Sequence, residues 1–101
     1  MVMFSIEQGD ILKVENIKYP VLVVSKNFFN RTEQAIVCPI IQDEPDDPLH
    51  IPFKAKKLSG TVLCEEMKLM DFRYRGFSLL DRIDYSDIIN ITDAIQSIFD
   101  Y

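Results

Sequence analysis

The sequence predicts an α+β fold, a small curled antiparallel β-barrel that carries one amphipathic α-helix at its C-terminal end. Short apolar runs rich in Val and Ile, separated by polar links, indicate several β-strands. The hydrophobic period becomes helical only in the last segment, after residue 85. A series of strands followed by a single late helix is typical of α+β proteins rather than of alternating α/β folds.

Two strands, at 20–25 and 35–41, are predicted to form the centre of the sheet. Each run is rich in Val and Ile and too short for a buried helix, so we expect strands buried on both faces. Pro20 fits the first position of its strand, where the ladder needs no backbone N–H. The link at 26–34 contains Asn and Thr residues that favour turns, and we expect a polar loop there.

The other predicted elements are shorter. In chain order they are a strand within 6–14 that follows a turn at Gly9 and Asp10, an exposed acidic loop at 42–48, a short edge strand at 50–53, a turn at 59–60, a strand at 61–64 with a continuation through 65–70, a turn at 72–77 and a last strand at 78–83. Pro52 argues against a central position for its strand. Ser86 is the expected N-cap of the helix. The apolar face of this helix is predicted to hold Ile88, Ile91, Ile95, Ile98 and Phe99.

Length and composition indicate one ordered domain spanning 1–101. Two halves of a 101-residue chain would each have little core, and apolar residues make up 48% of it. The longest apolar runs are too short to cross a bilayer, and the first residues lack the pattern of a signal peptide. We therefore expect a cytoplasmic protein that does not contact a membrane.

The cysteines and the single histidine argue against metal chemistry. Cys38 and Cys64 lie in apolar, strand-like runs, and we expect buried reduced thiols rather than a disulfide. With one His and no CxxC pair, the sequence predicts neither a metal site nor a cofactor.

The charge is acidic overall, with a basic middle. A net charge of −5 argues against indiscriminate binding to nucleic acids but leaves room for a local basic groove. The stretch at 54–75 holds six basic residues and three acidic ones. These six are candidates for phosphate contacts, or else an ordinary solvated surface: Lys54, Lys56, Lys57, Lys68, Arg73 and Arg75.

Several segments, in order along the chain, resemble the MazF/PemK toxin family. They are GDIL at 9–12, YPVLVVS at 19–25, NRT at 30–32, IVCPI at 36–40, GTVLCE at 60–65 and MKLMD at 67–71. The resemblance extends from about residue 8 to the C-terminus, which is nearly the whole chain. It implies the SH3-like barrel with a C-terminal helix that the CcdB, Kid and MazF toxins share.

The resemblance also implies a function. It implies the toxin component of a type II toxin–antitoxin system, an mRNA interferase that cleaves single-stranded RNA without a metal. It further implies a homodimer with an RNA groove across its interface and a cognate antitoxin that occupies the groove. The alternative is a non-catalytic binding module of the same fold that acts on a protein partner.

Two positions differ from the residues that many MazF-like enzymes use in catalysis. Where the family usually has an Arg before the strand-opening Pro and a Thr or Ser after the second strand, this chain has Tyr19 and Ile41. The candidates for catalysis are then Lys18, Tyr19 and Glu65. Lys18 would contact phosphate, Tyr19 would donate a hydrogen bond or stack on a base, and Glu65 matches an acid/base position of Kid. The structural alternatives are a solvated lysine, a packing residue and a solvated strand carboxylate.

Arg31 and His50 are two further candidates for a functional role. Arg31, in the NRT segment, matches a family loop that borders the RNA groove, although the same residues suit an ordinary loop. His50, in the predicted edge strand, is a candidate general base for which the sequence shows no partner.

Overall fold

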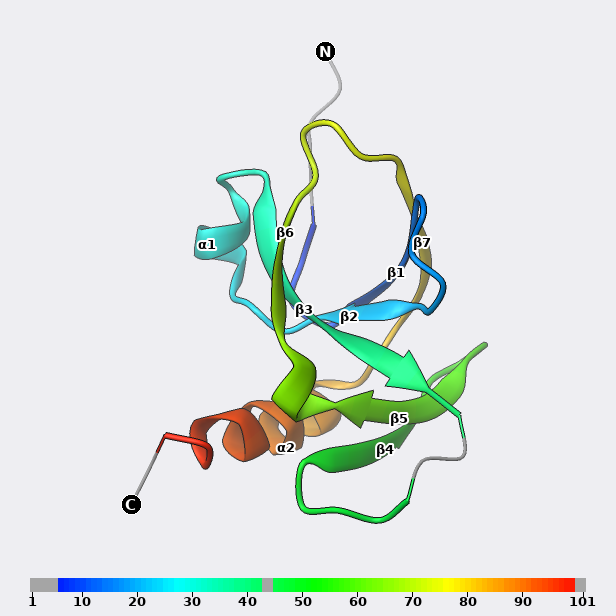
Figure 1. Cartoon of the computed structure of the whole chain (residues 1–101), viewed down its shortest axis with the longest axis vertical. Helices are drawn as coiled ribbons and strands as arrows, with labels where there is room; N and C mark the ends of the chain where they lie inside the picture. Colours follow the sequence, from blue (N-terminus) through cyan, green and yellow to red (C-terminus); the bar gives the residue numbers. More distant parts are fainter. Residues whose placement is uncertain (1–5, 43–44, 100–101) are drawn as a thin grey trace.

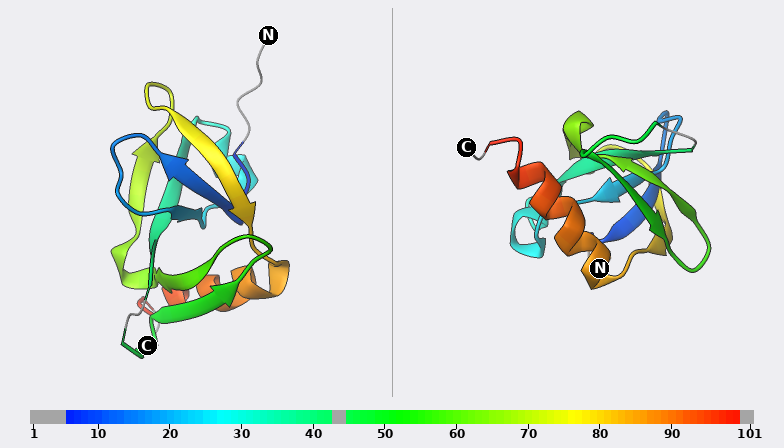
Figure 2. Two further views of the ribbon diagram at one scale, coloured as in Figure 1. Left: turned by 90° about the vertical axis from the view of Figure 1, so that its right-hand side faces the viewer. Right: turned by 90° about the horizontal axis from the view of Figure 1, so that it is seen from below.

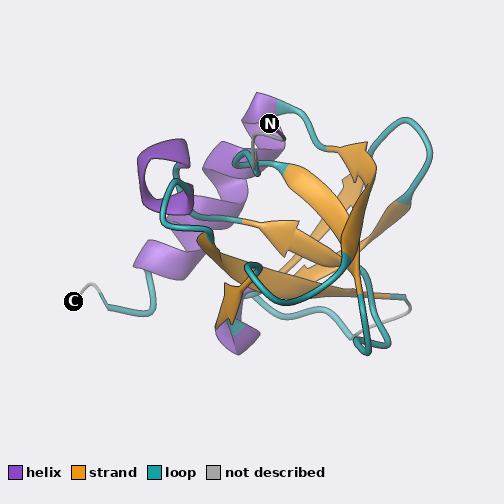
Figure 3. Cartoon of the chain, turned by 90° about the horizontal axis from the view of Figure 1, so that it is seen from above, coloured by secondary structure: helices purple, strands orange, loops and turns teal. Residues whose placement is uncertain are grey.

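A seven-stranded antiparallel sheet curls into a half-barrel in the computed structural model, which describes residues 6–42 and 45–99 (Figure 1). In chain order the elements are β1 (Asp10–Val14), β2 (Val21–Val23), α1 (Asn27–Asn30), β3 (Gln34–Ile41), β4 (His50–Lys54), β5 (Ser59–Leu63), the 3₁₀ helix η1 (Cys64–Glu66), β6 (Lys68–Asp71), β7 (Phe77–Arg82) and α2 (Tyr85–Gln96). Figure 3 shows the two α-helices on one side of the molecule and the strands curling beside them. The predicted α+β class, a curled antiparallel sheet with a C-terminal helix, is confirmed.

β3 is the strand on which the sheet is assembled. It pairs with β2 along one edge, and along its other edge with β6 in its first half and β5 near its end. Pro39 lies between these two stretches, which end at Val37 and resume at Ile40. The N–H of Ile40 donates to the Pro20 carbonyl of the β2 side at 2.9 Å, so the nitrogen of Pro39 faces the gap between β6 and β5. A residue without an N–H therefore stands where the strand has no partner to bond.

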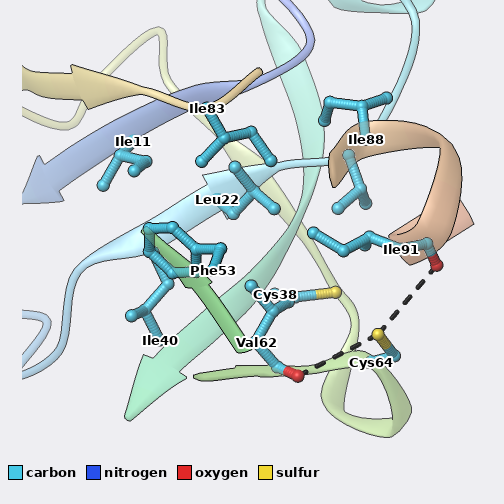
Figure 4. Packing of buried hydrophobic residues seen from close by; sticks show 11 residues of the cluster. Ile11, Leu22, Cys38, Ile40, Phe53, Val62, Cys64, Ile83, Ile88 and Ile91 are labelled. Carbon is cyan, nitrogen blue, oxygen red and sulfur yellow. Dashed lines mark hydrogen bonds between the residues drawn. The ribbon is translucent and has the colours of Figure 1, made fainter. Parts of the chain in front are cut away.

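Both faces of the central strands are buried, as predicted. Leu22 of β2 and Cys38 of β3 belong to a cluster that packs against Ile88 and Ile91 of α2 (Figure 4). Val21 and Val37 face the opposite way, into a second cluster. Alternation along each strand thus supplies two cores, one under the helix and one inside the curl of the sheet.

Several local expectations need correction. The turn expected at 59–60 is part of β5, where a Cβ on Gly60 would lie 2.7 Å from Ile40 Cγ2, so glycine permits close packing inside a strand. The continuous strand expected through 61–70 is broken by η1. The polar link at 26–34 contains the short helix α1. The edge position of β4, with its Pro52, is confirmed.

The C-terminal helix begins two residues earlier than expected. Asp84 is the N-cap rather than Ser86, because the N–H groups of Asp87 and Ile88 bond to the Asp84 carbonyl. Ile98 and Phe99 lie beyond the end of α2 and are exposed, so they do not belong to its buried face. Within the described residues, no helix is both long and apolar enough to cross a membrane.

The two cysteines are buried and free, as predicted. Cys64 Sγ lies 4.0 Å from both the Val62 and Ile91 carbonyl oxygens (Figure 4). Burial raises the pKa of Cys38 to about 12 and that of Cys64 to about 11. Both therefore act as small core side chains rather than as reactive thiolates.

An ion-pair cluster fastens the start of β1 to the end of β7. Arg82 Nη2 lies 2.6 Å from Glu7 Oε2 and 2.7 Å from Oδ1 of the buried Asp10, the second contact being an ion pair without hydrogen-bond geometry. The Glu7 N–H donates to the other Asp10 carboxylate oxygen at 2.9 Å. Burial raises the pKa of Asp10, and the positive charge of Arg82 opposes that rise.

Replacing this arginine is expected to destabilise the fold. Arg82→Leu leaves the buried Asp10 carboxylate without its cation, and we expect the free energy of unfolding at pH 7 to fall by about 2 kcal/mol, since Arg82 itself is half exposed. Urea denaturation followed by circular dichroism measures the change. Arg75→Leu, on the exposed loop after β6, is the control and should stay within about 0.5 kcal/mol of wild type. Equal stability of the two variants would contradict a structural role for the ion pair.

Candidate functional site

A cleft of about 380 Å³ opens beside the point where β3 changes partners. Its floor is apolar and includes the buried Val21, Val37 and Met70. The complete lining is Ile17, Tyr19, Val21, Val37, Pro39, Glu66, Met67, Lys68 and Met70. It therefore combines the β1–β2 loop, β2, β3, the end of η1 and β6, segments that are far apart in the sequence.

Three polar side chains stand on the rim of this cleft. Tyr19 is 42% exposed, and Glu66 and Lys68 are exposed as well. Within 6–42 and 45–99, neither the Glu66 carboxylate nor the Lys68 ammonium has a hydrogen-bond or ion-pair partner. A carboxylate, an ammonium and a phenol are thus available to a ligand above an apolar floor.

Lys18 stands next to the cleft through its neighbour. Its Nζ lies 5.5 Å from the centroid of the Tyr19 ring, which is cation–π distance. The structure thus brings together three of the sequence-predicted residues: Lys18, Tyr19 and Lys68. Ile41, at the end of β3 and paired with Thr61, does not line the cleft.

Glu65 points away from the cleft, toward His50 on β4. His50 Nε2 lies 2.8 Å from Glu65 Oε2, and His50 Nδ1 lies 2.9 Å from the Pro45 carbonyl oxygen. The sequence shows no partner for His50 because that partner, Glu65, is fifteen positions away on another element. The hydrogen bonds to the Pro45 carbonyl and to Glu65 raise the pKa of His50 to about 9.

The other basic candidates are spread over separate parts of the surface. Arg73 forms a bidentate pair with Asp71, and this hydrogen bonding lowers the pKa of the Asp71 carboxyl to about 2. Arg31 is the exposed C-cap residue of α1, and Arg75 lies on the exposed loop before β7. None of these three lines the cleft.

The lysines of the β4–β5 hairpin do not line the cleft either. The N–H groups of Lys57 and Leu58 donate to Asp81 Oδ2 at 2.6 and 3.0 Å, which ties this hairpin to β7. In Figure 2 (left) the hairpin end lies beside the end of β7, away from the β1–β2 loop. Lys54, at the end of β4, and Lys56 share this hairpin, so the basic stretch at 54–75 is not one continuous surface.

Sequence reasoning missed Glu66. As residues of an expected strand, Glu65 and Glu66 read as two solvated carboxylates, whereas in the structure Glu65 is paired with His50 and Glu66 lines the cleft. The available signal for the η1 turn was Pro39 in the middle of an apolar strand. A proline there indicates a break in the hydrogen-bond ladder, and it is near this break that the chain between β5 and β6 leaves the sheet. No group of three or more His, Cys, Asp or Glu residues suited to a metal ion occurs among the described residues.

Comparison with solved structures shows the same fold in known toxins. A chain of the MazE–MazF crystal structure (Form-I) from Deinococcus radiodurans matches with a TM-score of 0.85 and 21% identity, over 96% of this chain and 98% of that chain. An endoribonuclease in complex with its cognate antitoxin, from a mycobacterial species, matches with a TM-score of 0.82 and 17% identity, over 94% and 95% of the two chains. Mycobacterium tuberculosis toxin MazF-mt6 matches with a TM-score of 0.69 and 16% identity, over 90% and 99%.

Comparison of the sequence gives the family. No curated protein sequence matches the chain. A model of PemK-like, MazF-like toxins of type II toxin–antitoxin systems matches residues 7–99, which confirms the resemblance seen in the sequence. Because this match covers nearly the whole chain, the protein belongs to the PemK-like, MazF-like toxin family of type II toxin–antitoxin systems.

Proposed function

We propose that this toxin is a metal-independent endoribonuclease that cleaves single-stranded RNA in the cleft beside β3. The observation that carries the proposal is a carboxylate, Glu66, and an ammonium, Lys68, that share the rim of one cleft with Tyr19 and have no partner among the described residues. RNA cleavage needs a base for the 2′-hydroxyl proton and a cation for the charge that develops on phosphorus. Both kinds of group are present there.

The roles follow from the chemistry of each side chain. Glu66 is the general base: it accepts the 2′-hydroxyl proton as the 2′-oxygen attacks the adjacent phosphorus. The bond from phosphorus to the 5′-oxygen breaks, which leaves a 2′,3′-cyclic phosphate and a 5′-hydroxyl. Lys68 neutralises the pentacoordinate phosphate, and Lys18 adds positive charge nearby. Tyr19 offers an aromatic face on which a base can stack, or a hydroxyl that can protonate the 5′-oxygen.

Glu65 stays a candidate for acid/base catalysis. Its carboxylate is held by His50, so a direct acid/base role requires the side chain to leave that partner. Lys54, Lys56, Lys57, Arg31, Arg73 and Arg75 stay candidates for phosphate contacts outside the cleft, along RNA that extends beyond it.

The alternative is a non-catalytic module that binds a protein. Tyr19 and Ile41 favour it, because they replace the Arg and the Thr or Ser that the family resemblance leads one to expect at these positions. A phenol is uncharged at neutral pH and cannot clamp a phosphate with the fork of an arginine. The wild-type protein would cleave RNA if it is an endoribonuclease and would leave RNA intact if it is a binding module.

Substitutions on the cleft rim test the assignment. We expect Glu66→Gln and Lys68→Ala each to lower kcat/KM on a long single-stranded RNA at least a hundredfold, because each removes one group that acts in the transition state. Lys18→Ala is expected to lower kcat/KM by only about tenfold, because Lys18 stands next to the cleft rather than on its rim. Asp93→Asn, the same carboxylate-to-amide change on the exposed surface of α2, is the control.

The pattern of results decides between the hypotheses. Wild-type rates in both Glu66→Gln and Lys68→Ala would show that the chemistry lies elsewhere. A wild-type protein inert on every RNA tested would favour the binding module, and activity gained by Tyr19→Arg would then identify the missing cation.

Cleavage is expected to survive EDTA. The base and the cation are both side chains of the protein, so no step calls for a metal ion. RNA incubated with the toxin in excess EDTA should give the same products on a gel, at the same rate, as RNA incubated with the toxin in magnesium. Activity that disappears with EDTA and returns with added magnesium would contradict the mechanism.

We also propose a homodimer in the cytoplasm, bound by a cognate antitoxin when inactive. An apolar groove of about 320 Å³ runs between α2 and the sheet, lined among others by Ile36, Met67 and Ile89. Exposed apolar side chains continue it along and beyond the helix: Tyr85, Ile89, Ile98 and Phe99. An apolar surface of this kind is typical of obligate dimers.

The dimer is expected to depend on the α2 surface. Light scattering at micromolar concentration should give twice the mass of the 11.8 kDa chain for wild type, and a monomer for Ile89→Asp, because a buried charge opposes association. Asn90→Asp, one position along the helix, adds the same charge and should stay dimeric. A monomeric wild type would count against the assembly.

A further inference from the structure

We propose that His50 is a positioning residue, which holds the η1 turn through Glu65 and so presents Glu66 to the cleft. This inference rests on the proposed function as far as the effect on cleavage is concerned. Its structural part, the fixing of η1 by His50, can be tested without any activity.

The geometry of η1 sends its three side chains in three directions. A 3₁₀ helix has three residues per turn, so successive side chains point about 120° apart. Cys64 points into the core and lies 4.0 Å from the Ile91 carbonyl of α2. Glu65 points to His50, and Glu66 lines the cleft. A rotation of this turn therefore moves all three side chains together.

η1 packs against β3 and α2, and its own residues add two anchors. Its N-cap, Leu63, provides no side-chain hydrogen bond. The N–H of Cys64 donates to the Leu49 carbonyl at 2.9 Å, and the buried Cys64 anchors one direction. The Glu65–His50 contact at 2.8 Å supplies a second direction. Two anchors on different sides of a turn fix its rotation, and Glu66, the third side chain, is then placed without a hydrogen-bond or ion-pair partner among residues 6–42 and 45–99.

His50 is itself rigidly held. It lies opposite Leu63 in the β4–β5 ladder, immediately before η1 begins. Its two ring nitrogens bond to the Pro45 carbonyl and to Glu65, and its side chain is only 14% exposed. Both nitrogens are therefore occupied by protein atoms, so His50 has none left for a substrate and acts through Glu65.

The protonation state of His50 fits this role. Two acceptors, a carbonyl and a carboxylate, call for a ring that donates from both nitrogens, which is the imidazolium form. Among the described residues, the charged groups that act on it are Glu65 from η1 and Asp47 from the preceding loop, and both are acidic. The Pro45 and Glu65 hydrogen bonds raise the pKa of His50 to about 9, so the ring stays charged at pH 7.

The pH dependence has a definite sign. Because the folded-state pKa lies above the usual 6.5, the stabilisation is complete below about pH 6.5 and is lost as the pH rises through about 9. Above that pH the neutral ring can donate only one hydrogen bond, and either Glu65 or the Pro45 carbonyl loses its partner. The anchor of η1 should then weaken.

The test compares His50→Ala, His50→Gln and Glu65→Gln with wild type, and uses Asp93→Asn as the control. The first measurement is amide hydrogen exchange by NMR. We expect exchange at residues 64–67 to be at least tenfold faster in His50→Ala, with little change in β1 and β2. His50→Gln should lie between, because its amide can still donate to Glu65. The pKa of His50 should fall in Glu65→Gln.

The second measurement is cleavage of a short RNA as a function of pH. We expect His50→Ala to lower kcat between tenfold and a hundredfold with KM changed less than about threefold, since Glu66 is misplaced while the rest of the cleft is intact. Wild-type kcat should decline as the pH rises through about 9, and the variant should lack this step. A global loss of stability would instead change exchange throughout the sheet.

The two proposals fail in distinguishable ways. If wild type cleaves RNA and His50→Ala has the same kcat and pH profile, the positioning role is wrong and the proposed function stands. If wild type cleaves no RNA, the proposed function is wrong, and the exchange rates at residues 64–67 alone decide the structural part. Unchanged exchange there in His50→Ala would overturn it.

Discussion

The change of partners along β3 is the constraint on which the site depends. One eight-residue strand pairs with β2 along one edge, at residues 37–39, and divides its other edge between β6 and β5. Pro39 stands at the division and has no N–H to leave unsatisfied. Between leaving β5 and joining β6, the chain must cross this gap, and it does so as η1. The cleft lies at this crossing.

The same crossing separates two neighbouring carboxylates. In a continuous strand, Glu65 and Glu66 would point to opposite faces of one sheet. In η1, Glu65 turns toward β4 and meets His50, while Glu66 lines the cleft with Lys68 and has no partner within the described part of the chain. Two acids that are adjacent in sequence thereby acquire different environments, and one of them is available for proton transfer while the other is tied to the scaffold.

The sequence predicted the fold better than the site, for physical reasons. Apolar runs of Val and Ile report burial directly, so the central strands and the late helix were predictable, as was the edge position of a strand that contains Pro52. Ser59 and Gly60 suggested a turn because glycine usually marks one, whereas here the missing Cβ makes room for Ile40. The His50–Glu65 pair joins residues on separate elements, and no local pattern encodes it.

The charge distribution fits a small anion-binding site on an acidic protein. Two of the eleven basic side chains are neutralised by ion pairs among the described residues: Arg73 is paired with Asp71, and Arg82 with Glu7 and Asp10. Lys68 lines the cleft, exposed and without an ion-pair partner in the part of the chain that the structure describes, and Lys18 lies over the ring of Tyr19. A net charge of −5 opposes the approach of RNA over most of the surface, so attraction is confined to places where such cations gather. Lys68 and Lys18 place positive charge at the cleft, while the other exposed lysines and arginines lie on separate parts of the surface, so the described surface offers separate cationic sites rather than one continuous basic face.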